Sequence, residues 1–165
     1  MTQFAAPGMS RRRRDPNAPM HRPEGGFRAH FPARRSYAAL DLGTNNCRML
    51  IARPDGDQFF IIDAFSRIVR LGEGLGATGR LSDAAMDRTV AALAVCADKL
   101  MKRNVHLSRS VATEACRRAT NGAEFVERVY RETGIKLDVI AAEEEARLAV
   151  IGCHRLLEDG DGPAL

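Results

Sequence analysis

A polar turn containing one glycine lies between two short apolar runs, residues 37–40 and 49–52. Its residues that can do chemistry are Asp41, Gly43, Thr44, Asn45 and Asn46. Glycine lets the backbone approach a ligand closely, and small polar side chains with backbone N–H groups bind oxyanions. The pattern is typical of a phosphate-binding turn beside a carboxylate that could hold a metal or a water. An ordinary β-hairpin turn also explains it.

A second group of charged residues occupies the segment 113–121, directly after a predicted strand at 106–112. Strand ends in α/β folds face ligand clefts, and an arginine there can bind a phosphate through two parallel hydrogen bonds. Arg117 and Arg118 are the candidates. By themselves, they are also explained as solvated side chains on a helical turn.

Three consecutive glutamates, Glu143, Glu144 and Glu145, open a predicted helix after the next strand. Carboxylates in a first helical turn complement the helix dipole, which is a purely structural reason for such a run. A functional reason is that one of them acts as a general base and deprotonates an attacking water. The run alone does not say which.

Residues 74–79 match the pattern G-x-G-x-x-G, with Asp98 about twenty residues on, as in dinucleotide-binding sites. In such sites, however, the helix begins within the glycines. Here Arg80 and Leu81 intervene before Ser82, the residue that we expect to cap the helix. An NAD-binding protein is therefore the less favoured alternative.

The elements that must position these residues follow from hydrophobic periodicity and from turn and cap residues. We expect strands at 37–40, 48–53, 58–66, 106–112 and 137–140, and helices that begin after Ser82, after Asn121 and at Glu143, the second closed by Gly134. The last helix is expected to bury Ala146, Ala149, Val150, Cys153 and Leu157. Three meandering strands followed by alternating helices and strands predict an α/β layer with a mixed sheet.

The 165 residues suit one domain, and no apolar run approaches the ~20 residues that cross a bilayer. With no apolar secretory signal at the N-terminus, we expect a cytoplasmic protein without membrane contact. The four cysteines are scattered and are expected to be small buried hydrophobic residues: Cys47, Cys96, Cys116 and Cys153.

Residues 1–35 carry eight arginines against two acidic residues, a net charge of +6, whereas the whole chain carries +4. The remainder is therefore slightly acidic. This proline-rich stretch has no periodicity, and we expect a disordered tail. Its arginines could bind polyanions weakly, or they could form a solvated extension without a fixed partner.

Four motifs in order carry a resemblance: D-L-G-T-N-N at 41–46, L-G-E-G-L-G at 71–76, T-E-A-C-R-R-A-T-N at 113–121 and E-E-E-A-R-L-A at 143–149. Together they resemble the N-terminal domain of the exopolyphosphatase/guanosine pentaphosphate phosphohydrolase (Ppx/GppA) family, over residues 36–157. That family belongs to the actin and sugar-kinase superfamily, with a ribonuclease-H-like fold. The resemblance implies hydrolysis of terminal phosphates from inorganic polyphosphate, guanosine pentaphosphate or both, with a divalent metal, usually Mg²⁺.

The resemblance also implies roles for individual residues. The phosphate loop falls on Gly43, Thr44, Asn45 and Asn46, with Asp41 holding Mg²⁺, Arg117 binding phosphate and Glu145 as the catalytic base. The family often has serine at positions 44 and 46, and many members have Ser-Gly at 141–142. Thr44 keeps the hydroxyl, whereas Asn46 offers an amide.

The family continues with a second phosphate loop, an acidic residue before a glycine-rich turn, and residues 160–165 stop just short of it. We therefore expect residues 36–165 to be an incomplete ribonuclease-H-like phosphatase domain, either a fragment or a truncated relative. A non-catalytic polyphosphate- or nucleotide-binding module and an inactive fragment remain alternatives. The choice between the two substrates and the formation of a homodimer also stay open.

Overall fold

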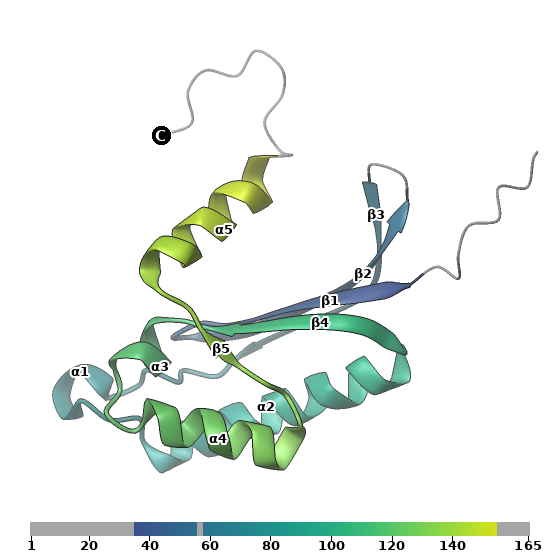
Figure 1. The fold of residues 1–165 in the computed structure, drawn as a ribbon. Helices are drawn as coiled ribbons and strands as arrows, with labels where there is room; N and C mark the ends of the chain where they lie inside the picture. Colours follow the sequence, from purple (N-terminus) through teal and green to yellow (C-terminus); the bar gives the residue numbers. More distant parts are fainter. Residues whose placement is uncertain (1–34, 56–57, 155–165) are drawn as a thin grey trace, which may run out of the picture. The chain divides into compact units, whose positions relative to one another are not determined.

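The computed structural model describes residues 35–55 and 58–154, which belong to one compact unit, residues 32–165 (Figure 1). The predicted tail, apart from Arg35, lies outside the described residues, as does Leu157. Within the described ranges, no helix is long and apolar enough to cross a membrane.

The described residues form five strands and five helices. The strands are β1 (Ser36–Leu42), β2 (Asn46–Asp55), β3 (Gln58–Ile68), β4 (Val105–Ala112) and β5 (Asp138–Val139). The helices are α1 (Leu75–Thr78), α2 (Asp83–Lys102), α3 (Glu114–Arg118), α4 (Gly122–Thr133) and α5 (Ala142–His154). All five predicted strands and all three predicted helices are present, and α1 and α3 are two short additional helices.

The strands form one sheet in the order β3-β2-β1-β4-β5. The pairs β1–β2 and β2–β3 are antiparallel, whereas β1–β4 and β4–β5 are parallel. This mixed sheet confirms the predicted α/β class. Because β1, β4 and β5 are parallel, their carboxyl ends meet at one edge of the sheet.

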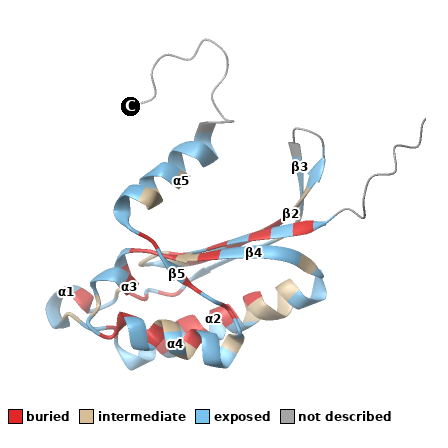
Figure 2. Cartoon of the chain, viewed as in Figure 1, coloured by how far each residue is buried: buried red, intermediate tan, exposed pale blue. Residues whose placement is uncertain are grey.

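The hydrophobic core lies between one face of the sheet and the helices α2 and α4 (Figure 2). Along β1, buried and exposed residues alternate, as expected for a strand with one covered face. Leu40 and Leu42 therefore point into the core, and Asp41 points to the opposite face. That opposite face exposes large apolar side chains, among them Tyr37 and Leu107, which pair across β1 and β4.

Two predicted helix boundaries are confirmed in atomic detail. The Ser82 hydroxyl accepts a hydrogen bond from the N–H of Ala85 at 3.3 Å and so caps α2. Gly134 ends α4 with a φ of 73°, a left-handed conformation that favours glycine, and its N–H donates to the carbonyl of Tyr130.

Asn121, in contrast, does not cap α4 with its side chain. The side-chain oxygen accepts from the N–H of Leu81 at 2.9 Å, and the side-chain amide donates to the Leu81 carbonyl at 3.0 Å. Asn121 thus satisfies two backbone groups forty residues away and ties the start of α2 to the start of α4. Local sequence rules describe only the helix that follows the residue, so they miss this role.

The predicted inward face of α5 is wrong for its described members. Ala146, Ala149, Val150 and Cys153 are all exposed. Leu148, which was not on that face, is half-buried and lines a cavity over the sheet. Periodicity identified a helix here, but a pattern of alanines does not determine which side meets a neighbour.

Three of the four cysteines are buried, as expected, whereas Cys153 is exposed. Burial raises the pKa of the Cys116 thiol to about 12. A thiol with such a pKa stays protonated at neutral pH and is a poor nucleophile. Cys116 is therefore a packing residue of α3 and not a catalytic group.

Candidate functional site

The turn at 43–46 is held in place by its own backbone and by the segment after β3. Gly43 N–H donates to the Asn46 carbonyl at 2.9 Å, and the carbonyls of Thr44 and Asn45 accept from N–H groups of residues 69–72 at 2.8–3.0 Å. Among the described residues, no hydrogen bond uses the N–H groups or side chains of Thr44 and Asn45. The turn therefore keeps N–H groups that no described residue uses, and its binding of an anion stays a prediction.

Gly72, a glycine of the L-G-E-G-L-G motif, contacts this turn, which the motif alone does not indicate. Its N–H is one of the groups that hold Thr44. A Cβ added at Gly72 would overlap Cγ2 of Thr44. A side chain at this glycine of the L-G-E-G motif would therefore have to displace the Thr44 methyl group.

We expect Gly72→Ala to displace Thr44 and to lower the free energy of unfolding by about 1–3 kcal/mol, because the added methyl group overpacks this contact. The shift in melting temperature on adding polyphosphate should shrink as well, since the donors of the turn move. The double variant Gly72→Ala/Thr44→Ser, which lacks Cγ2 but keeps the hydroxyl, should recover both quantities. If both variants melt alike, this steric explanation is wrong.

Arg117 connects the segments that follow β4 and β5. It lies on α3, and its Nη1 donates to the carbonyl of Ile140, just after β5, at 2.6 Å. The same Nη1 lies 3.8 Å from Oε2 of Glu145. A hydrogen bond also joins the carboxyl ends of β1 and β4, because Thr113 N–H donates to the Leu42 carbonyl at 3.2 Å. The structure thus brings Arg117 and Glu145 together at the strand ends.

The three glutamates of α5 have three different environments. Glu144 receives hydrogen bonds from Arg147 at 2.6 and 2.9 Å and from Arg109 of β4 at 3.3 Å. Glu143 is exposed, and among the described residues it has no ion pair within 4.0 Å. Glu145 faces Arg117, with a side chain 45% exposed. Of the three, it is the one that lies beside a predicted phosphate ligand.

Hydrogen bonds from Arg147, followed by charge interactions with Arg147 and contacts from Arg109, lower the pKa of Glu144 to about 2, below its usual 4.5. A carboxyl whose pKa is lower in the folded state stabilises the fold fully above pH ~4.5, and that stabilisation is lost as the pH falls through ~2. The hydrogen bond from Arg109 to Glu144 attaches α5 to β4.

We expect Glu144→Gln to lower the melting temperature modestly at pH 7, because the partners are partly exposed and screened by solvent. The difference from wild type should shrink as the pH falls from about 5 towards 2, where the wild-type carboxyl becomes protonated. Thermal melts of the two proteins across this range test the assignment. A difference that does not change with pH would contradict it.

Asp41 lies at the end of β1 on the face away from the core. Burial raises the pKa of its carboxyl, and the nearby Arg48 acts in the opposite direction. Asp41 lines a cavity of about 630 Å³ over this face, together with Arg48, Arg109, Leu148 and apolar strand residues. None of the other predicted site residues lines this cavity. The structure does not bring Asp41 into one cavity with Arg117 and Glu145.

The carboxylates of the candidate site could hold a magnesium ion only if water and substrate supply most of its ligands. Within the described ranges, no three His, Cys, Asp or Glu side chains converge as metal ligands. Mg²⁺ is often held by one or two carboxylates, with water and substrate phosphate oxygens completing its shell. Asp41 supplies one carboxylate of that kind.

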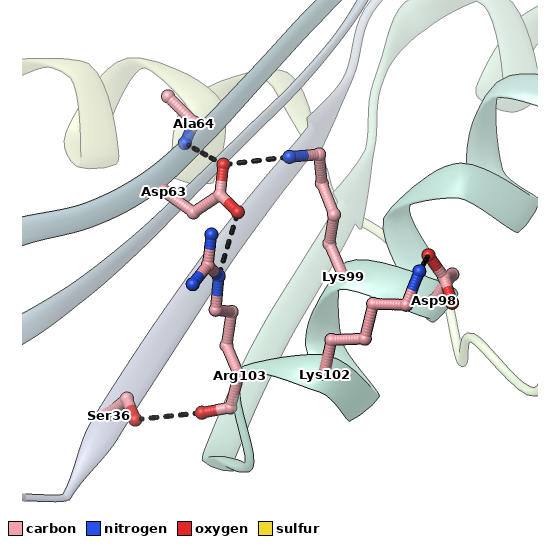
Figure 3. A network of polar contacts seen from close by, with 7 residues as sticks. All are labelled: Ser36, Asp63, Ala64, Asp98, Lys99, Lys102 and Arg103. Atoms are coloured by element: carbon pink, nitrogen blue, oxygen red, sulfur yellow. Dashed lines mark hydrogen bonds and ion pairs between the residues drawn. The ribbon is translucent and has the colours of Figure 1, made fainter.

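The glycine stretch at 74–79 departs from a dinucleotide site. The helix within it, α1, has four residues and is capped by Gly79, and α2 begins only at Asp83. Asp98 lies within α2 and forms an ion pair with Lys102 at 2.8 Å (Figure 3), whereas the ribose-binding acid of such sites ends a strand.

Comparisons with known proteins agree on one family. The model of the Ppx/GppA phosphatase family matches residues 50–164. A Ppx/GppA family member from Aquifex aeolicus is 35% identical, with a TM-score of 0.69 over 72% of this chain and 39% of its own. An exopolyphosphatase-like protein is 34% identical, with a TM-score of 0.72 over 79% of this chain and 40% of its own. An exopolyphosphatase from Cytophaga hutchinsonii is 27% identical, with a TM-score of 0.66 over 69% of this chain and 36% of its own. The chain thus spans about two fifths of these solved structures.

Proposed function

The chain belongs to the Ppx/GppA phosphatase family, and we propose that it supplies the terminal-phosphate site of a hydrolase acting on inorganic polyphosphate, guanosine pentaphosphate or both. The observation that carries this proposal is the meeting of Arg117 and Glu145, 3.8 Å apart, at the strand edge that also holds the 43–46 turn. A cationic phosphate ligand and a carboxylate base are the two groups that hydrolysis of a phosphate chain needs.

In the proposed reaction, the backbone N–H groups of Thr44 and Asn45 and the guanidinium of Arg117 bind oxygens of the terminal phosphoryl group. Glu145 orients a water molecule and accepts its proton. A bond forms between the water oxygen and phosphorus, and the bond from phosphorus to the bridging oxygen breaks. The shortened chain leaves with the bridging oxygen, and inorganic phosphate is released. Positioning and charge stabilisation supply most of the acceleration in such reactions.

Asp41 would hold Mg²⁺, which neutralises negative charge on the substrate when bound. Asp41 lies near the end of β1, and the turn begins two residues after it. The residue that would hold the ion is therefore a near neighbour in the chain of the proposed phosphate donors. We expect the metal to bind mainly through the substrate, since one carboxylate gives weak affinity alone.

A second candidate function is a polyphosphate-binding module without hydrolysis. Asp41 and the Arg117–Glu145 pair do not line one cavity, and a binder, unlike a hydrolase, needs no metal and base together.

The test is release of inorganic phosphate from long-chain polyphosphate and from guanosine pentaphosphate with Mg²⁺, with the melting temperature of the protein measured in parallel. Release from either substrate that stops with a chelator supports the hydrolase and identifies its substrate. A rise in melting temperature without release supports the binding module. No release and no rise would contradict both functions.

A further inference from the structure

A second basic site lies at the other end of the sheet from the candidate phosphate site. Where β1 begins, polar side chains from β1, β2, β4 and the end of α2 surround a cavity of about 610 Å³. They are Arg35, Ser36, Arg53, Arg103, Asn104 and His106. No acidic side chain lines this cavity. The seven residues of β1 separate it from the 43–46 turn by about 20 Å.

Most N–H donors of the guanidinium groups that line this cavity have no hydrogen-bond partner among the described residues. Nε of Arg53 is buried and has no hydrogen-bond partner among the described residues. Arg35 donates from Nη1 to Nε2 of His106 at 3.0 Å, and Arg103 donates from Nε to Asp63 at 3.0 Å (Figure 3). The other guanidinium N–H groups of the three arginines take part in no hydrogen bond within residues 35–55 and 58–154. A buried donor without a partner is costly, and the unpaired guanidinium N–H groups beside it can donate to an anion in the cavity.

The charge of this region is positive even after its counter-charges are included. Asp63 accepts from both Lys99 at 2.8 Å and Arg103, so this group of three keeps one positive charge (Figure 3). Arg35 and Arg53 add two more. The carboxyl end of α2 contributes about half a negative charge, which is smaller than the remaining positive charge. A helix-capping role for Arg103 therefore does not explain Arg35, which directly precedes β1, or Arg53, which lies on β2.

We propose that this cavity binds an oligophosphate: inorganic tripolyphosphate or the triphosphate of a nucleotide. Planar guanidinium groups bind phosphate oxygens through paired hydrogen bonds, and three of them match an anion with several charges better than a single carboxylate. The Asn104 amide adds a neutral donor at the same cavity. This site is independent of the proposed hydrolysis, because it shares no residue with the strand-end site.

Calorimetric titration of the protein with tripolyphosphate tests the proposal. All titrations use the Arg117→Ala background, which weakens the strand-end site. In that background, Arg53→Gln should raise the dissociation constant by about tenfold, the effect of one lost charged hydrogen bond. Arg35→Gln, an exposed position, should raise it in the same direction. Arg131→Gln is the matched control, since it removes the same charge from an exposed position of α4 outside the cavity.

The same titrations with ATP distinguish the two sources of the anion. Equal loss of ATP and tripolyphosphate binding in Arg53→Gln supports phosphate recognition alone, and tighter ATP binding identifies a nucleotide as the ligand. The proposal is overturned if tripolyphosphate does not bind, or if Arg53→Gln and Arg35→Gln bind it as tightly as Arg131→Gln. Because the readout is binding at a remote cavity, it does not depend on whether the protein hydrolyses phosphate.

Discussion

Replacing Glu145 by glutamine is expected to lower the rate of phosphate release by about 10²- to 10⁴-fold, the range that general-base catalysis supplies. Glutamine keeps the shape of the side chain but cannot accept a proton from water. The variant should still bind polyphosphate with nearly wild-type affinity, because the donors of the 43–46 turn and Arg117 remain. The reason to choose this carboxylate is its position 3.8 Å from Arg117.

Rates of phosphate release and the dissociation constant for polyphosphate are measured for wild type, Glu145→Gln and Glu143→Gln. Glu143 is the matched control, because it lies in the same first turn of α5 but is exposed and has no ion pair among the described residues. Glu143→Gln should turn over normally. A normal rate in Glu145→Gln, or an equal loss in both variants, would show that Glu145 is not the base.

The sequence predicts most of the sheet because the signals for its elements are local. Short apolar runs at 37–40 and 49–52 indicate β1 and β2, Ser82 indicates where α2 begins, and Gly134 indicates where α4 ends. The turn at 43–46 is predictable for the same reason. Its glycine and polar residues are adjacent in the chain, and the hydrogen bonds that hold it come from one neighbouring segment.

The contacts that distinguish one site residue from another are not local, and the sequence does not reveal them. The three glutamates look alike in the chain, yet Arg109, thirty-five residues earlier, pairs with Glu144. Asn121 bonds to Leu81 across forty residues, where a cap rule predicts a local bond. The space beside Gly72 is occupied by Thr44, which the motif around Gly72 does not contain. Each result depends on the sheet having first brought distant segments together.

Arg117 has a structural role and, in the proposed reaction, a chemical one, so its removal is expected to have the second largest effect. Its Nη1 holds the Ile140 carbonyl at 2.6 Å and so links α3 to the chain that leads into α5. The remaining donors of the guanidinium are available to phosphate oxygens. Arg117→Ala removes both functions, whereas Arg117→Lys keeps the charge but loses the planar pair of donors.

Arg117→Ala is expected to lower kcat by about 10²- to 10³-fold, as for loss of one preorganised donor to the transition state, and to raise KM as well. Arg118→Ala, the neighbouring residue, is the control, because Arg118 is exposed and pairs with Glu114 at 2.9 Å away from Glu145. Steady-state kinetics on polyphosphate separate the two parameters.

Arg117→Lys should recover part of KM, which depends on charge, but little of kcat, which depends on the position of the donors. Unchanged kinetics in Arg117→Ala would remove this residue from the site. A loss that lysine restores fully in kcat would mean that charge alone, and not the geometry fixed by Ile140, is what the reaction requires.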